Sequence, residues 1–395
     1  MKKLKKLNRL LAFLAFGFLS VNLLAWDKID PAILAHADKG VDAIYDLDLL
    51  TARTELATLL KEHPNYPLGL FGQVMIEWAR YEYEFEKSNV EQAKVFENII
   101  NSSILGIEMW LKQNKDEAQA YLALGGIYGV KARFLLANRS YVRAYFTGKK
   151  GLKYMNKAVE LDPEMYDAYL GKAIYEYYAG TLPAVVKVLA KLVISGNAEK
   201  GIEYLNLIKN KGRYSANTAK LLLVEIAIQN KKYSNPPLAE QYIKEIIAKY
   251  PQNPLFRFVA IIAAYQNKNY ADVRSGAQDF LNKIGKEPFY KEIYIARSYT
   301  ALASADMQEG KYQEAVKVLE QSIEATKHQE MSRWQLWNIF RLAQSYDALG
   351  QREKALEIYK SIKNYKEDWG IYDEAKKYLK TPFTAGTDIG LMSPP

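Results

Sequence analysis

A basic stretch without acidic residues is the part of the chain best suited to bind an anion. From residue 119 to residue 159 there is no Asp or Glu, and the stretch carries Tyr128, Arg133, Arg139 and Arg143. Arg139 and Arg143 are four residues apart, so they share one face of a helix. Guanidinium groups bind carboxylates and phosphates through paired hydrogen bonds, which predicts a site for a small anionic or amphipathic ligand. The alternative is a solvated face whose acidic partners come from neighbouring helices.

Trp334 and Trp337 form a second set of candidate binding residues. The chain is rich in aromatic residues, with 30 tyrosines, 14 phenylalanines and 6 tryptophans. Aromatic anchors dominate the binding energy of many protein interfaces. The two tryptophans therefore either line a concave binding groove or pack into the core.

The chain offers little for catalysis, for a metal or for a cofactor. It has no cysteine, and His36, His63 and His328 are too scattered to form a metal-binding pair on one helix. Neither a glycine-rich phosphate loop nor a nucleophile-elbow serine occurs. We therefore predict a protein that is not an enzyme, with no catalytic residues, no metal and no cofactor.

Charge argues against nucleic acid as a partner. The whole chain has 54 Lys and Arg against 45 Asp and Glu, a net charge of +9. Residues 1–25 hold five bases and no acid, so the remainder carries only +4. A balance this weak, spread over a long chain, does not make a nucleic-acid surface.

The elements that must position these residues are helices that recur in pairs. Residues with small side chains repeat along the chain at intervals of roughly 34 residues or more, as expected where two helices cross closely. The positions of this ladder are Ala52, Ala93, Gly151, Gly201, Ala239, Val273, Ala315 and Ala355. Such a ladder is typical of stacked helix pairs.

The best-patterned segment runs from Leu342 through Tyr346, Gly350 and Ala355 to Tyr359. It resembles the tetratricopeptide repeat, and the segments 302–315, 239–251 and 52–64 are similar to it. The resemblance implies an all-α fold, a right-handed superhelical solenoid of about eight antiparallel helix pairs over residues 26–379, without a sheet. Solenoids of this kind are binding scaffolds for unrelated partners.

Two departures from the repeat stand out. The pair at 116–161 is elongated, and it holds the basic stretch described above. A helix rich in Leu, Val and Ala is inserted at 182–194, from Leu182 to Ile194, between a first helix and its second helix. Its apolar surface must lie on the stack, cover a partner site or contact a membrane surface.

A second resemblance covers only residues 120–210. This part is similar to a eukaryotic tetratricopeptide family linked to the mitochondrial outer membrane and to inclusion-body clearance. The matching residues are Gly180, Leu182, Pro183, Lys187, Leu189, Gly196 and Gly201. The resemblance implies a shared variant of the repeat fold rather than a shared task.

The two ends of the chain read differently from the repeats. Residues 1–25 have a basic start, an apolar run and Ala25 at a cleavage position, which predicts a signal peptide and a periplasmic or secreted protein. The alternative is an inner-membrane anchor left uncleaved. A capping helix is expected at 369–379, and residues 380–395, rich in Gly, Pro and Thr, are expected to be disordered.

These features predict an exported, non-enzymatic scaffold that binds a protein or peptide partner in its concave groove. A carrier or sensor of a small anionic or amphipathic ligand is one alternative. An adaptor that contacts a membrane surface through residues 182–194 is the other.

Overall fold

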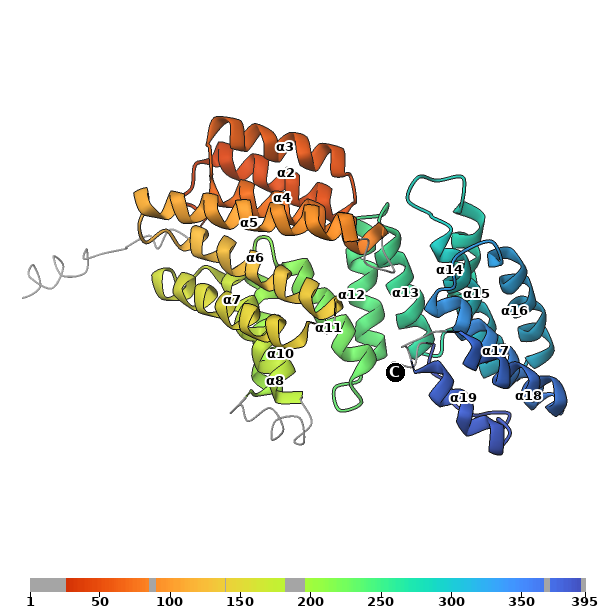
Figure 1. Ribbon diagram of the computed structural model, residues 1–395. Coiled ribbons are helices and arrows are strands. Elements are labelled where there is room, and N and C mark those ends of the chain that lie inside the picture. Colours follow the sequence, from red (N-terminus) through yellow and green to blue (C-terminus); the bar gives the residue numbers. More distant parts are fainter. Residues whose placement is uncertain (1–25, 85–89, 139, 182–195, 366–369, 392–395) are drawn as a thin grey trace, which may run out of the picture.

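The computed structural model describes residues 26–84, 90–138, 140–181, 196–365 and 370–391. Within these ranges the chain forms 17 α-helices and two short 3-10 helices, and the described residues contain no strand (Figure 1). The predicted signal peptide, Arg139 and the predicted inserted helix at 182–194 lie outside the described residues.

The first half of the array comprises α2 (Pro31–Tyr45), α3 (Leu49–Glu62), α4 (Pro67–Glu84), α5 (Val90–Gln113), α6 (Ala118–Ala137), α7 (Tyr141–Leu161), η1 (Tyr166–Ala168), α8 (Tyr169–Thr181) and α10 (Ala198–Lys211). The second half comprises α11 (Ala216–Gln229), α12 (Pro236–Lys249), α13 (Pro254–Gln266), α14 (Tyr270–Lys283), α15 (Ile293–Gln308), α16 (Tyr312–Thr326), α17 (Arg333–Ala348), α18 (Arg352–Ser361), η2 (Ile362–Asn364) and α19 (Ile371–Lys380).

Consecutive helices pack against each other in pairs, which confirms the predicted all-α array. The pairs are α2/α3, α4/α5, α6/α7, α8/α10, α11/α12, α13/α14, α15/α16 and α17/α18, and α19 packs on α18. The first helices of successive pairs also touch one another, as α13 touches α15 and α15 touches α17. Through such contacts the first helices form a layer in each half of the array, from α2 to α8 and from α11 to α17, and we call the side that they line the inner face.

Local sequence signals fix where many of these helices begin. Asn235 and Asn253 each accept a hydrogen bond from a backbone N–H in the first turn, and each precedes a proline at the helix start. Proline fits there because it lacks the N–H that a first turn leaves unpaired. Ser332 and Gln335 form a reciprocal capping box at the start of α17.

Short residues set the distance between the two helices of a pair. A Cβ placed on Gly201 of α10 would lie 2.6 Å from the amide nitrogen of Tyr177 in α8. In the elongated pair, a Cβ on Gly151 would lie 3.0 Å from the carbonyl oxygen of Gly125. Other ladder residues are fully buried, and Ala93 is the half-buried exception. The two helices therefore approach backbone to backbone at Gly151 and Gly201, and the other ladder residues are packed between their helices.

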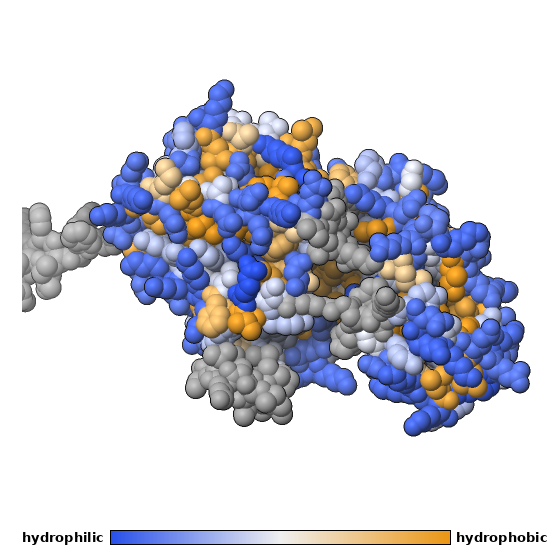
Figure 2. All heavy atoms as spheres, viewed as in Figure 1, coloured by the Kyte–Doolittle hydropathy of each residue, from blue (hydrophilic) through white to orange (hydrophobic). Residues whose placement is uncertain are grey.

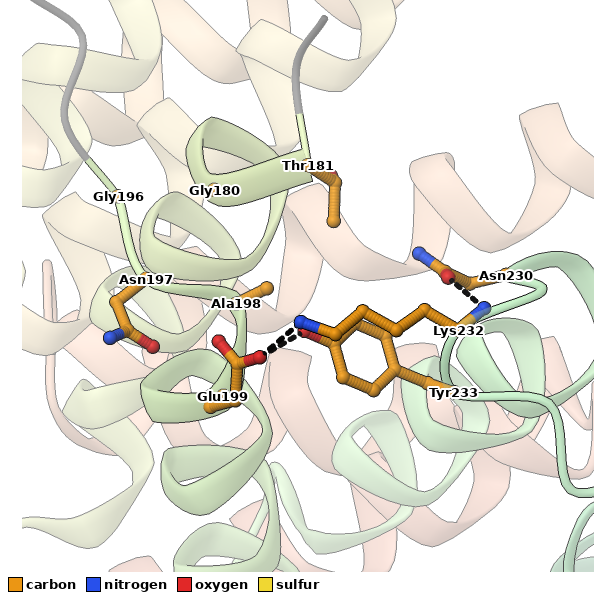
Figure 3. A pocket seen from close by; sticks show the side chains of 9 residues that line it. All are labelled: Gly180, Thr181, Gly196, Asn197, Ala198, Glu199, Asn230, Lys232 and Tyr233. Atoms are coloured by element: carbon orange, nitrogen blue, oxygen red, sulfur yellow. Dashed lines mark hydrogen bonds and ion pairs between the residues drawn. The ribbon is translucent and has the colours of Figure 1, made fainter.

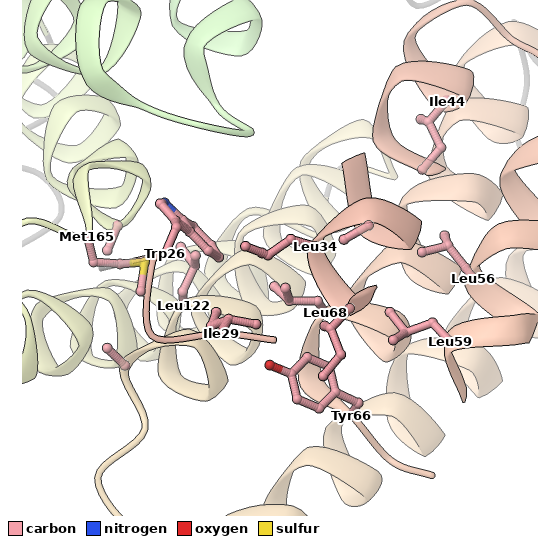
Figure 4. Packing of buried hydrophobic residues seen from close by; sticks show 14 of the residues in the cluster. Trp26, Ile29, Leu34, Ile44, Leu56, Leu59, Tyr66, Leu68, Leu122 and Met165 are labelled. Atoms are coloured by element: carbon pink, nitrogen blue, oxygen red, sulfur yellow. The ribbon is translucent and has the colours of Figure 1, made fainter. Parts of the chain in front are cut away.

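The chain before and within α2 fills the inner side of the first half of the array. Trp26 and Ile29 are buried with Leu122 of α6 and with Met165 just before η1 (Figure 4). The ring of Trp26 meets that of Tyr214 edge to face, with centroids 4.9 Å apart. A partner was expected to bind in the concave groove, but this part of the inner side is occupied by the protein's own residues.

Polar contacts at the end of α2 reach residues about midway along the chain. Arg213 makes two hydrogen bonds to the carboxylate of Asp38, at 2.6 and 2.9 Å. Asp42 accepts hydrogen bonds from Lys249 at 2.8 Å and from the hydroxyl of Tyr250 at 2.7 Å. The first helix thus contacts the ends of α10 and α12, and the array curls back on itself.

The described residues 381–391, which we call the C-terminal segment, belong to the tail expected to be disordered, and in the structure they pack on the repeats. Phe383, Ile389 and Leu391 are buried, with at most 5% of each residue exposed. A turn holds Thr384 and Thr387 together through a backbone hydrogen bond of 3.2 Å. Gly386 in this turn has φ +80°, which glycine adopts without strain. Buried apolar contacts outweigh the weak local propensity of a sequence rich in Gly, Pro and Thr.

The close crossing at Gly201 predicts that a single methyl group disturbs the stack. We expect Gly201→Ala to lower the free energy of unfolding by about 1–3 kcal/mol, because backbone atoms of α8 block the new Cβ. The matched control is Gly129→Ala in α6, where a Cβ meets nothing within 4 Å. Because alanine favours a helix over glycine by about 1 kcal/mol, this control should be neutral or stabilising. Chemical denaturation measures both, and equal stability of the two variants would contradict the assigned crossing.

Candidate functional site

The candidate site is the inner face of the last repeats, where α13, α15 and α17 lie side by side. The C-terminal segment returns from α19 and crosses this face. It is a stretch of polypeptide without regular secondary structure, with a turn at 384–387, and side chains of a row of helices hold it, so its contacts report what the face can recognise.

Side chains from several helices bind the backbone of the C-terminal segment. The hydroxyl of Tyr265 in α13 donates a hydrogen bond of 2.6 Å to the carbonyl oxygen of Ile389. Gln308 at the end of α15 donates one of 3.1 Å to the carbonyl oxygen of Thr387. Burial raises the pKa of Tyr265 well above its ordinary value, so its hydroxyl remains a donor.

Two further contacts fix the start of the segment. The amide N–H of Phe383 donates a hydrogen bond of 2.9 Å to the carboxylate of Asp347, which Arg352 also binds at 2.9 Å. The amide N–H of Gly386 donates one of 2.7 Å to the hydroxyl of Tyr312. Because these bonds involve only the segment's main chain, they recognise its backbone rather than particular side chains.

Apolar side chains of the segment enter the layer of helices. Ile389 and Phe383 share a buried cluster with Met307 of α15 and Leu342 of α17. Leu391 is fully buried in a second cluster. The other members of that cluster include Leu47, Phe258, Tyr265 and Trp334. The end of the segment therefore meets the turn after α2, which closes the inner face from the other side.

Arg341 of α17 is the most unusual group at the site. It is 2% exposed, and its guanidinium donates hydrogen bonds to the side chain of Gln344 at 2.7 Å and to the carbonyl oxygen of Gly390 at 2.6 Å. The Nε atom has no hydrogen-bond partner among the described residues. Burial lowers the pKa of Arg341 to about 10, which reflects the cost of placing a cation in this environment.

Trp334 and Trp337 both lie at this face, and both are almost buried. The ring of Trp334 stacks edge to face with Phe258, with centroids 5.6 Å apart, and shares the cluster of Leu391. The ring of Trp337 lies 4.8 Å from the guanidinium of Arg341. The two tryptophans therefore pack in the core, and they also contact groups that hold the segment.

The basic stretch does not form a common pocket among the described residues. Tyr128 is buried and stacks on Tyr154, with Lys150 over its ring at 4.5 Å. Arg133 instead lies over the ring of Trp78 in α4, at 5.5 Å. Arg143 is exposed near the start of α7. Tyr128 and Arg133 therefore face different helices, and Arg139 lies outside the described residues.

A polar recess of about 320 Å³ lies beside the ends of α8 and α10 (Figure 3). Its carboxylate, Glu199, accepts hydrogen bonds from Lys232 at 2.5 Å and from the hydroxyl of Tyr233 at 2.7 Å. These donors lower the pKa of Glu199 to about 2. The charged groups of the recess satisfy each other, so they leave no unpaired charge for a ligand.

The described residues contain no group of three or more His, Cys, Asp or Glu side chains that could hold a metal ion. Helix α6 is long and apolar enough to cross a membrane by length and composition, but most of it is buried by neighbouring helices.

Sequence reasoning missed most of the residues that hold the segment. Tyr265, Gln308, Tyr312 and Asp347 look like ordinary repeat residues in the sequence. Two signals were available in the sequence. Arg341 is a lone charge in an apolar stretch of α17, and the tail contains the large apolar residues Phe383, Ile389 and Leu391. Neither signal indicates that the two contact each other.

Comparison with known proteins identifies the repeat in the same region. Residues 294–367, which span α15 to α18, match the family model described as tetratricopeptide repeat. A search of the curated proteins found no match, and no catalytic family was found. The match does not include residues 120–210, where the eukaryotic family was suggested. Residues 294–367 thus contain a tetratricopeptide repeat, and the paired helices of the other described residues are consistent with an array of similar repeats.

Proposed function

We propose that this protein is a non-enzymatic scaffold that binds an extended segment of a partner protein on the inner face of its last repeats. Tetratricopeptide repeat domains typically mediate protein–protein binding. The observation that carries the proposal is the C-terminal segment itself. The side chains of Tyr265, Gln308 and Arg341 donate hydrogen bonds to its main-chain carbonyl groups. A face that holds one extended polypeptide in this way has the chemistry to hold another.

The chemistry of this face favours a polypeptide over a small molecule. Donors from α13, α15 and α17 meet three backbone carbonyl groups, at Thr387, Ile389 and Gly390. Buried apolar clusters take up the side chains of Ile389 and Leu391 beside these donors. The proposed partner is therefore a protein with an accessible extended segment.

Photo-crosslinking tests whether the inner face contacts the partner. We expect a photoreactive amino acid at Gln308, on α15, to form an adduct with a partner polypeptide in extracts of the cells that make the protein. The control carries the same group at Lys317, which is exposed on the second helix α16. Adducts at Lys317 but not at Gln308 would place the partner on the outer surface and contradict the proposal.

We also propose that the scaffold works outside the cytoplasm. The basic start, the apolar run and Ala25 support cleavage by signal peptidase, after which the mature chain would begin at Trp26. Trp26, the residue after this cleavage position, is buried with Ile29 in the helical array.

If the protein is exported, its mature chain should begin at one defined residue. Edman sequencing or intact mass of the protein purified from its source should give Trp26 as the first residue. The control is a variant with Ala25→Gln, whose larger side chain should block cleavage. A chain that keeps residues 1–25 in the source cells would favour the uncleaved membrane anchor instead.

A second candidate function is contact with a membrane surface through the tip of the elongated pair. The visible surface is mostly hydrophilic (Figure 2). At the start of α7, however, Tyr141, Val142 and Phe146 are between 61% and 71% exposed. Val142, Phe146 and Lys149 follow helical spacing, so an apolar stripe continues into a basic residue on one face. Apolar and basic residues together suit an anionic lipid surface.

Vesicle flotation tests this second function. We expect the full chain to float with vesicles of phosphatidylcholine and phosphatidylglycerol, and the double variant Val142→Glu, Phe146→Glu to remain unbound. The control replaces two exposed apolar residues elsewhere, Leu50→Glu and Val95→Glu, and should float like the unchanged chain. Equal flotation of the two double variants would exclude the tip of α7 as the membrane contact.

A further inference from the structure

We propose that the C-terminal segment is a built-in competitor that occupies the partner's own site, and that the partner presents an extended apolar–small–apolar sequence like Ile389-Gly390-Leu391. This inference rests on the function proposed above and adds two things to it. It gives the chemical class of the bound sequence, and it gives a means by which the protein controls its own binding.

The first step is that the segment occupies the inner face in the manner of a bound peptide. Its contacts come from helices that are remote from it in the chain, such as Tyr265 of α13, whose hydroxyl binds the carbonyl oxygen of Ile389. The residues between its anchors, from Thr384 to Asp388, are exposed. Anchors at both ends with an exposed middle are typical of a docked ligand rather than of a chain threaded through the core.

The second step concerns the sequence that the site selects. Ile389 and Leu391 enter two different buried clusters, one beside Met307 and one beside Phe258. The residue between them has its carbonyl oxygen 2.6 Å from the guanidinium of Arg341. Two apolar side chains separated by one residue fit these clusters, and in the segment the residue between them is glycine, whose carbonyl oxygen accepts from the guanidinium.

The third step is that the segment satisfies the site only in part. Arg341 is buried, and its Nε atom has no hydrogen-bond partner in the described structure. The indole Nε1 of Trp337, whose ring lies 4.8 Å from the same guanidinium, also has none. Buried donors without acceptors weaken an interaction. A partner that supplies one more acceptor beside Arg341 therefore competes favourably with the segment.

The fourth step is the tether. The segment follows α19 directly, so its effective concentration at the site is in the millimolar range, as for other short connections. It can therefore keep the site closed with modest intrinsic affinity. A partner must either bind more tightly than the segment or arrive when the segment is displaced.

The experiment compares two double variants of the full chain. Ile389→Ser with Leu391→Ser removes the two apolar anchors, whereas Ala385→Ser with Asp388→Asn changes exposed residues of the same segment. The probe is a fluorescent synthetic peptide with the sequence of residues 381–391. We expect the first variant to bind this peptide at least about 10-fold more tightly than the unchanged chain, and the second to bind as the unchanged chain does. Equal affinities of the two variants would overturn the proposal.

A locked variant keeps the test decisive if loss of the anchors disturbs folding. The chain has no cysteine, so Gln308→Cys and Thr387→Cys can be joined selectively by a short bismaleimide. The unmodified pair retains Ile389 and Leu391 and is the reference for the joined pair, because the two differ only in the link between residues 308 and 387. The joined pair should lose measurable binding, and unchanged binding after joining would also overturn the proposal.

The same variants separate this inference from the proposed function. If a partner crosslinks through position 308 equally in the unchanged chain and in the Ser variant, the scaffold function stands and the competitor role fails. If the peptide binds only when the anchors are removed but no partner forms an adduct, the competitor role stands and the scaffold function fails.

Discussion

The architecture depends on backbone contact between the two helices of each pair. At Gly201 the helices are so close that a Cβ would lie 2.6 Å from a backbone nitrogen of the neighbouring helix. Fully buried Ala52, Ala239 and Ala355 occupy the corresponding position in other pairs. This spacing fixes the orientation of each pair, and repeated along the chain it produces one layer of first helices and one of second helices. The inner face exists because the pairs stack in this way.

What that face can bind depends on how the two ends of the chain use it. Trp26 and Ile29 fill the inner side of the first half, and contacts such as Asp42 with Tyr250 hold the first helix against the middle of the array. The C-terminal segment fills the inner side of the last repeats. Leu47, which follows α2, and Leu391 belong to one buried cluster, and this cluster connects the residues that fill the two halves. A repeat array that would otherwise expose a long groove is thus closed by its own ends.

The candidate site combines strong apolar anchoring with incomplete polar pairing. Leu391 is fully buried, whereas Arg341 has an unpaired Nε close beside it. The sequence shows where these residues stand in the chain, but it does not show that they come together. Arg341 and Gly390 lie on different elements, and only the return of the chain after α19 brings them together. The basic stretch shows the opposite outcome, because Tyr128 and Arg133 are near in sequence yet face different helices.

The sequence by itself determined the elements: paired helices, close crossings at the ladder residues, and the caps that start α12, α13 and α17. These follow from local spacing and short-range hydrogen bonds, which neighbouring residues carry with them. Only the tertiary structure decided where the chain ends go. A tail rich in Gly, Pro and Thr has no helical period, so its local propensity predicts disorder. Its three apolar side chains become ordered because the stacked helices offer buried sites, and those sites exist only after distant repeats have packed.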